Sequence, residues 1–271
     1  MPAPNLLLVG CQKSGTTWTH LSLRKSRHIM ATAEKELHFF IQPETGRNWD
    51  NYLRHFPFRE GARYYMETTP GYFQLPTSSH DIAADVRASL GDPKVMVIFR
   101  NPVERYESAY IHHMDKGRLP YVDEIREINT DMHQLLDLGR YGSILAHWRS
   151  HFPDIGVFFY DDIQADRMRF LSGMMAFLGL ENDLTPEATD FRANDKIKKA
   201  RERHPDWRRI PTLHPDTAAG LRDFYRDEIG LLQDLTQRDL SHWLVPSAPQ
   251  HGSTTGGLRD YIRRLQKRIG S

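Results

Sequence analysis

Residues 6–18 read LLLVGCQKSGTTW, and this stretch decides the fold class. The four apolar residues 6–9 predict a short buried strand that ends at Gly10. Gly15 follows five residues later, and two threonines come directly after it. A strand, a glycine-containing turn and the start of a helix, in this order, form an anion site in which backbone N–H groups and the helix dipole meet a phosphate. The stretch therefore predicts an α/β protein with a phosphate ligand.

The stretch nearly matches G-x-x-x-x-G-K-[ST], the loop of nucleoside-triphosphate-binding proteins. The lysine, however, stands at Lys13 inside the loop, and Thr16 occupies its usual place. A second apolar strand, residues 94–99, is followed by Arg100, where an ATPase would need an acidic residue to hold Mg²⁺. An arginine favours an anion, so the pattern favours a phosphate ligand bound with no metal.

Short apolar segments alternate with helical patterns along the chain. The expected strands are residues 5–9, 63–66, 94–99 and 155–160. The expected helices are residues 16–27, 103–113, 168–178 and 216–235, with a further helical spacing of apolar residues over 135–152. This alternation predicts a P-loop-type three-layer α/β fold, with a central parallel sheet and helices on both faces.

The domain should span residues 1–245, with a linker over 246–257, which reads PSAPQHGSTTGG. Residues 258–271 then predict a short basic amphipathic helix. That helix either packs back on the domain or serves a membrane surface or partner.

Composition sets limits on the function. The formal net charge of the 271 residues is +1, so bulk charge predicts no nucleic-acid partner. The one cysteine excludes a disulfide within the chain and a cysteine-based zinc site. We see no signal peptide and no transmembrane segment, and we expect a cytoplasmic protein. The oligomeric state is not readable.

A second anchor for an anion follows the strand at 94–99. Residues 100–108 read RNPVERYES, so that Arg100 leaves the strand end and Ser108 lies two helical turns further on. An arginine fork and a hydroxyl could hold one phosphate together. The alternative is that Arg100 pairs with Glu104 and Ser108 merely packs.

The loop and this second motif together resemble the sulfotransferase family, whose members use adenosine 3′-phosphate 5′-phosphosulfate (PAPS). The resemblance implies that the loop holds the 5′-phosphosulfate and that Arg100 and Ser108 hold the 3′-phosphate. Lys13 would stabilise the charge on the leaving 5′-phosphate. The loop residues that the resemblance assigns to the donor are Lys13, Ser14, Gly15, Thr16, Thr17 and Trp18.

Residues 34–40, EKELHFF, resemble the branch of that family that contains the heparan sulfate sulfotransferases. By this resemblance Glu36 is the general base, and His38 orients it or contacts the substrate. We expect Phe39 and Phe40 to provide apolar surroundings that raise the pKa of Glu36. The alternative is a packed histidine and a surface carboxylate.

Residues 65–73, YMETTPGYF, resemble the family's E-K-[TS]-P-x-Y segment at the cleft. Glu67 and Tyr72 are therefore expected to contact the acceptor, although they could instead serve the turn itself. Thr68 stands where the glycan-specific members have a lysine, which weakens the expectation of a glycan acceptor.

A basic run at 196–205 lies near the position where the family closes a loop over the nucleotide. Lys198, Lys199 and Arg201 are the candidates, and a solvated basic stretch is the alternative. Further residues could line the acceptor side of the cleft and suggest a polar or anionic acceptor: Arg47, Trp49, Tyr52, His112, His113, Lys116 and Arg118.

The sequence thus predicts transfer of a sulfuryl group from PAPS to a hydroxyl or amine of a small-molecule or glycan acceptor, without a metal. Two other classes stay open at this point. One is a nucleotide-dependent phosphotransferase on the same fold, and the other is a module that binds a nucleotide without turnover.

Overall fold

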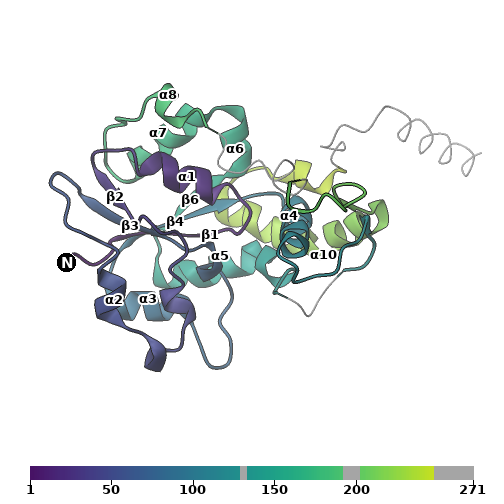
Figure 1. The fold of residues 1–271 in the computed structure, drawn as a ribbon, viewed down its shortest axis with the longest axis horizontal. Coiled ribbons are helices and arrows are strands. Elements are labelled where there is room, and N and C mark those ends of the chain that lie inside the picture. The colour runs from purple at the N-terminus through teal and green to yellow at the C-terminus, as the bar shows by residue number, and fades with distance from the viewer. Residues whose placement is uncertain (129–132, 192–201, 247–271) are drawn as a thin grey trace, which may run out of the picture.

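The computed structural model describes residues 1–128, 133–191 and 202–246. Its centre is a five-stranded sheet in which every neighbouring pair is parallel (Figure 1). In spatial order the strands are β2 (Ile29–Ala31), β3 (Tyr64–Thr68), β1 (Leu6–Gly10), β4 (Lys94–Phe99) and β6 (Gly156–Phe159). The strand that carries the phosphate loop is therefore the central one.

Helices cover both faces of this sheet, as Figure 1 shows: α1, α6, α7 and α8 lie on one side, and α2, α3 and α5 lie on the other. Helices α4 and α10 lie beside the sheet, and α10 packs along α5. Two short strands, β5 (Glu124–Ile125) and β7 (Thr212–Leu213), form a separate parallel pair. The helix bounds are α1 (Thr16–Leu23), α2 (Trp49–Leu53), α3 (Ile82–Leu90), α4 (Pro102–Asp115), α5 (Tyr141–His151), α6 (Tyr160–Ala165), α7 (Arg167–Phe177), α8 (Pro186–Thr189) and α10 (Pro215–Thr236).

Alternation along the strands builds two hydrophobic cores, one for each face of the sheet. Successive side chains of a strand point to opposite faces. In β1, Leu6 and Leu8 join the core under α1 and α7, whereas Leu7 and Val9 join the core on the α5 side. All four side chains are at most 1% exposed. The predicted three-layer fold is confirmed.

Helix α1 is shorter than predicted. It ends at Leu23 instead of continuing to residue 27, because the chain tightens into turns in which Lys25 and Ser26 donate to carbonyls three residues back. The turn brings the chain directly into β2. We did not predict β2, since a three-residue strand leaves too little pattern to recognise.

The helical spacing of apolar residues over 135–152 corresponds to two separate helices in the structure. A 3₁₀ helix covers Asp137–Gly139, and α5 begins only at Tyr141. At Gly139 a β-carbon would lie 2.6 Å from the ring of Tyr225 in α10, so this close approach requires glycine.

Two predictions fall mostly outside the described residues, namely the linker over 246–257 and the basic helix over 258–271. Among the described residues, we find no helix that combines the length and the apolar character needed to cross a bilayer.

Candidate active site at the carboxyl edge of the sheet

Every strand of the central sheet ends at the same edge, because all of them run in parallel. In open α/β sheets ligands bind at this carboxyl edge. The predicted site residues follow from these strand ends: the loop after β1, Glu36 after β2, and Arg100 after β4. The structure therefore brings the separate sequence motifs to one edge.

Two glycines shape the loop after β1. At Gly10 a β-carbon would lie 2.5 Å from Cβ of Phe73, so a larger residue would collide with the segment that follows β3. Gly15 caps α1 with a φ of 84°, which favours glycine. A β-carbon at Gly15 would lie 3.0 Å from Ile163 and 3.1 Å from Tyr160 of α6. The loop therefore packs closely against the segment after β3 on one side and against α6 on the other.

The loop offers polar groups to an anion. The hydroxyl of Ser14 is buried and, among the described residues, has no hydrogen-bond partner. A buried hydroxyl without a partner is uncommon in folded proteins, and an incoming anion could provide one. Thr16 at the start of α1 is 4% exposed, and Thr17 is partly exposed. Lys13 has a φ of 68°, a strained value of the kind that clusters at functional sites.

Trp18, which the resemblance assigns to binding of PAPS, is largely buried among apolar side chains. Its side chain is 7% exposed, packs between Phe170 and Phe191, and donates its indole N–H to the carbonyl of Thr189 (3.2 Å). The indole thus joins α1 to α7 and α8, and a contact of Trp18 with the donor stays a prediction.

Arg100 links the two predicted anion anchors. Its Nη1 donates to the carbonyl of Lys13 (3.3 Å), and its Nε and Nη2 both contact the carboxylate of Glu104 (3.1 and 3.0 Å). The guanidinium also lies over the ring of Tyr160, 4.8 Å from its centroid. The pairing with Glu104 thus exists alongside a position beside the loop. Ser108 is half-buried on α4, and its contact with a phosphate stays a prediction.

Glu36 is fixed through its backbone. Its N–H donates to the carbonyl of Thr68 at the end of β3 (2.9 Å), which extends the pairing between β2 and β3. The φ angles of Glu36 and His38 are 66° and 56°. The carboxylate is 45% exposed, pairs with Lys35, and lies 3.9 Å from Nε2 of His38. Both side chains therefore lie on the same side of the segment and reach solvent.

The pKa of Glu36 is lowered, contrary to the prediction. Burial alone would raise this pKa, but the charge and hydrogen bond of Lys35 outweigh it, with help from the charges of His38 and Lys13. The rings of Phe39 and Phe40 are buried in the core, where Phe39 stacks on Tyr52. The influence of Lys13 on this pKa also places its charge within range of Glu36.

Glu67 and Tyr72 are interior residues. Their side chains are 0% and 1% exposed, so neither offers an atom to an acceptor in this structure. Glu67 accepts hydrogen bonds from the hydroxyls of Tyr52, Thr69 and Tyr72, and burial raises its pKa in spite of these bonds. The Tyr72 hydroxyl also accepts from the backbone N–H of Phe40 (3.2 Å). The prediction is corrected: this network holds the segment after Glu36 against β3.

His20 is a buried polar residue near the strand ends that we did not predict. It is 1% exposed on α1, with Nδ1 2.9 Å from Oγ1 of Thr68 and Nε2 3.0 Å from the carbonyl of Thr32. Burial lowers its pKa to about 4. His20 ties α1 to the ends of β2 and β3. A lone histidine in a helix gives no sequence signal for this role.

The acceptor-side candidates fall into two groups. Arg47, Tyr52 and His113 are buried, with the Arg47 side chain 2% exposed and ion-paired to Asp85. Burial lowers the pKa of His113 to about 4, together with the charges of His133, Arg118 and Lys13. The candidates that reach the surface to differing extents are Trp49, His112, Lys116 and Arg118.

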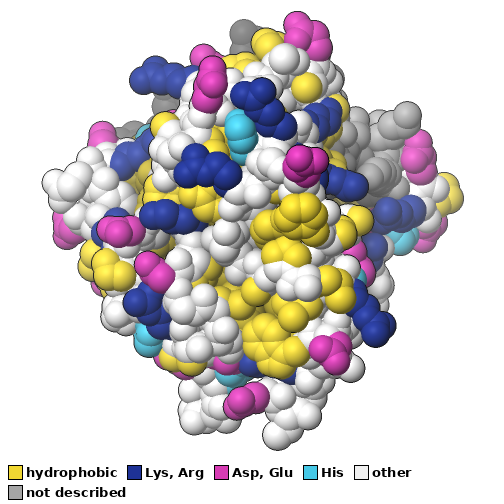
Figure 2. Space-filling model, turned by 90° about the vertical axis from the view of Figure 1, so that its left-hand side faces the viewer, with side chains coloured by type: hydrophobic (Ala, Val, Ile, Leu, Met, Phe, Trp, Pro, Cys, Tyr) yellow, Lys and Arg dark blue, Asp and Glu magenta, His cyan; other side chains and the backbone are white. Residues whose placement is uncertain are grey.

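A basic cavity of about 410 Å³ opens beside β2 and was not predicted. Figure 2, which views the side of the molecule carrying β2 and α2, shows Lys and Arg side chains gathered on this face. The cavity is lined by Arg24, Met30, Ala31, Ala33, Arg54, His55, Pro57 and Arg59. It lies along the chain that leads from β2 to Glu36.

Lys198, Lys199 and Arg201 lie outside the described residues, so their contact with a nucleotide stays a prediction.

Comparison with known proteins gives a consistent family. The profile of the sulfotransferase domain matches residues 3–226. Human bifunctional heparan sulfate N-deacetylase/N-sulfotransferase 1 is 24% identical over 276 residues, which cover 89% of this chain and 31% of that protein. Human heparan sulfate glucosamine 3-O-sulfotransferase 3B1 is 26% identical over 243 residues, covering 82% of this chain and 60% of that protein. The chain thus spans less than two thirds of these relatives.

Solved structures share the fold. A sulfotransferase from Alicyclobacillus acidocaldarius superposes with a TM-score of 0.72 at 24% identity, over 90% of this chain and 99% of that chain. A sulfotransferase domain from the curacin biosynthetic pathway gives a TM-score of 0.53 at 12% identity, over 89% and 99% of the two chains. Since the family profile covers most of its length, this chain belongs to the sulfotransferase domain family.

Proposed function

We propose that this chain transfers the sulfuryl group of PAPS to a hydroxyl or amine of an acceptor and releases adenosine 3′,5′-bisphosphate. The observation that carries the proposal is the 3.3 Å hydrogen bond from Arg100 to the carbonyl of Lys13. It joins the ends of β4 and β1, so that the groups proposed for the 3′-phosphate and the 5′-phosphosulfate lie at one site. A triphosphate nucleotide has no 3′-phosphate for the second anchor.

The residues divide the chemistry between them. The acceptor atom attacks sulfur, the bond from sulfur to the bridging phosphate oxygen breaks, and its electron pair leaves on the 5′-phosphate. Lys13 stabilises the charge that develops on this leaving group. The Glu36 carboxylate takes the proton of the acceptor, and its lowered pKa keeps it ionised and ready to do so at neutral pH.

We infer that the acceptor is polar and carries anionic groups, and that a carbohydrate is the best candidate. Support comes from the cavity beside β2, which presents Arg24, Arg54 and Arg59 close to the chain that leads to Glu36. Arginine forks suit carboxylate and sulfate groups. Two of the relatives are named for heparan sulfate, which is consistent with such an acceptor. The absence of a lysine at Thr68 is no objection, because that side chain is 0% exposed and contacts His20.

Ligand-induced stabilisation tests the donor. We expect adenosine 3′,5′-bisphosphate to raise the melting temperature without any metal. At a ligand concentration of 100 times its Kd, the free energy of unfolding should rise by about 2.7 kcal/mol. ATP with Mg²⁺ should raise the melting temperature only slightly. Arg100→Ala should weaken the effect of the bisphosphate, whereas the exposed Arg169→Ala on α7 serves as the matched control. Stabilisation by ATP with Mg²⁺ alone would overturn the proposal.

A panel of acceptors with labelled PAPS tests the acceptor class. Label should pass to anionic saccharides in preference to neutral phenols, and Arg54→Ala should raise KM for the saccharides more than it changes kcat. Transfer to phenols alone would contradict the acceptor assignment while leaving the donor assignment intact.

The location of the protein in the cytoplasm stays a prediction.

A further inference from the structure

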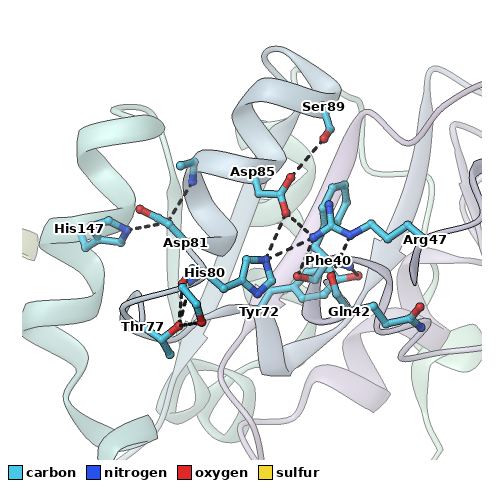
Figure 3. A network of polar contacts seen from close by, with 12 residues as sticks. Phe40, Gln42, Arg47, Tyr72, Thr77, His80, Asp81, Asp85, Ser89 and His147 are labelled. Carbon is cyan, nitrogen blue, oxygen red and sulfur yellow. Dashed lines mark hydrogen bonds and ion pairs between the residues drawn. The ribbon is translucent and has the colours of Figure 1, made fainter. Parts of the chain in front are cut away.

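A second group of titratable side chains lies between α3 and α5. Asp81 precedes α3, and His147 and His151 stand one turn apart on α5. Nε2 of His147 is 3.0 Å from Oδ1 of Asp81, and Nε2 of His151 is 3.7 Å from Oδ2. One ligand atom from each residue lies within 4.8 Å of the other two. Figure 3 shows Asp81 and His147 reaching toward each other from the two helices.

We propose that Asp81, His147 and His151 bind a divalent transition-metal ion, with Zn²⁺ as the best fit. Two ligand atoms that each lie about 2.0–2.1 Å from a tetrahedral zinc are roughly 3.3–3.4 Å apart. The two measured separations, 3.0 and 3.7 Å, fall on either side of this value. These two separations involve different oxygens of Asp81, so the side chains would rotate to place one of these oxygens and both imidazole nitrogens around the ion.

The donor set selects the metal. Two imidazole nitrogens and one carboxylate oxygen suit zinc and its neighbours, whereas Mg²⁺ and Ca²⁺ require mostly oxygen ligands. The three side chains are 21–31% exposed, so a water molecule can complete the coordination. The carboxylate is already oriented, because Oδ1 of Asp81 accepts the N–H of Ala84 (3.1 Å). Ligands held by such outer hydrogen bonds bind metals more tightly.

The ion would act as a staple rather than as part of the sulfuryl transfer. It would join the start of α3 to the end of α5, two helices that cover the same face of the sheet (Figure 1). His80 is next to Asp81 in the sequence, and its Nε2 lies 3.2 Å from Oδ2 of Asp85. The same Asp85 carboxylate pairs with Arg47. Arg47 in turn donates to the carbonyl of Gln42 (2.9 Å), as Figure 3 shows. The staple would thus steady the segment that follows Glu36.

Metal titration of the full chain tests the proposal. After treatment with EDTA and its removal, Zn²⁺ alone should bind with a stoichiometry of one and raise the melting temperature. Co²⁺ should give the visible absorption of a four-coordinate ion. His151→Gln should lose the Zn²⁺ affinity by at least about 100-fold, since even changes outside the ligand set cost 10–100-fold. Asp81→Asn should lose it as well, while the asparagine still caps α3.

His242→Gln is the matched control. His242 also pairs with one carboxylate, that of Asp161 at 3.0 Å, yet in the described part of the chain this pair belongs to no three-ligand group. This variant should bind Zn²⁺ as the unchanged protein does. Equal Zn²⁺ affinity in all four proteins, or no binding by the unchanged protein, would overturn the proposal. If a variant fails to fold, the Co²⁺ spectrum of the unchanged protein tests the proposal instead, and a spectrum without the absorption of a four-coordinate ion would overturn it.

Discussion

At the scale of single residues, the site depends on how charges surround Glu36. Its carboxylate is flanked by Lys35 and His38 and lies within the field of Lys13. Removing the negative charge while keeping the shape separates binding from proton transfer. Glu36→Gln should bind adenosine 3′,5′-bisphosphate normally and lose about 10²–10⁴-fold in turnover. Equilibrium binding and single-turnover transfer of label measure the two effects, and unchanged turnover would remove Glu36 from its role.

Lys35 sets the pH range of the proposed base. Because Lys35 lowers the pKa of Glu36, activity should persist on the acid side down to below the usual pKa of a glutamate. Lys35→Gln removes this influence, so the acid limb of kcat/KM should move to higher pH. Arg27→Gln, which changes a surface cation paired with Asp183, is the control. An acid limb that stays in place in Lys35→Gln would show that another group titrates.

His20 links stability to pH. Its folded pKa of about 4 lies below the usual 6.5, so below pH 6.5 the unfolded chain binds a proton that the folded chain does not. Stability from His20 is therefore present above pH 6.5 and is lost as the pH falls toward 4. Between pH 7 and pH 5 the loss is about 2 kcal/mol.

Urea unfolding at the two pH values measures this loss. His113 contributes a change of the same sign, because its pKa is lowered too. In His20→Gln the decrease between pH 7 and pH 5 should be smaller by about 2 kcal/mol. An identical slope in His20→Gln would contradict the assignment.

The sequence predicted that the regions of Lys13 and Arg100 meet, and a hydrogen bond from Arg100 to the Lys13 carbonyl joins them. Lys13 and Arg100 stand beside strand ends, and parallel strands bring these ends to one edge whatever lies between them. Sequence reasoning failed for Glu67 and Tyr72, because Glu67 lies within β3 and its carboxylate is buried among hydroxyls that donate to it. Only the packed structure shows Tyr52 reaching Glu67 from α2.

At the scale of elements, the loop after β1 depends on its contact with the segment after β3. Gly10→Ala would place a methyl group 2.5 Å from Cβ of Phe73. Overpacking of this kind costs about 1–3 kcal/mol. The loop would also shift, so the affinity for adenosine 3′,5′-bisphosphate should fall. Urea unfolding and calorimetric titration of the ligand measure the two losses.

Gly230→Ala on α10 is the matched control, because the methyl group that it adds would have open space for 4 Å around it. It should stabilise the protein by about 0.5–1 kcal/mol through helix propensity. A Gly10→Ala protein of unchanged stability and affinity would show that the loop tolerates a side chain.

Element boundaries were predicted well where burial is strong. Strand β4 has the predicted bounds, since five of its six residues are buried between two helical layers. The end of α1 and the existence of β2 were missed, because residues 24–31 depend on turns and on pairing with β3, which lies far away in the sequence.

At the scale of the whole molecule, α10 closes one side of the fold by packing on α5. Leu232 of α10 is fully buried in the hydrophobic core, whereas its neighbour Leu231 is 39% exposed. Leu232→Ala should cost about 2–5 kcal/mol. Leu231→Ala keeps the Cβ that lies against Gly142 and should cost much less. Equal unfolding free energies for the two variants would show that α10 is not integral to the domain.

The strand order also has a consequence for how the molecule is made. The central strand β1 precedes both of its neighbours in the sequence, since β3 and β4 begin only at Tyr64 and Lys94. During synthesis β1 therefore has two open edges until β3 has emerged, and one open edge until β4 has emerged. Such edges attract other chains, and pairings between distant segments form slowly. The loop after β1 thus depends for its shape on two strands that come later in the sequence and dock on either side of β1.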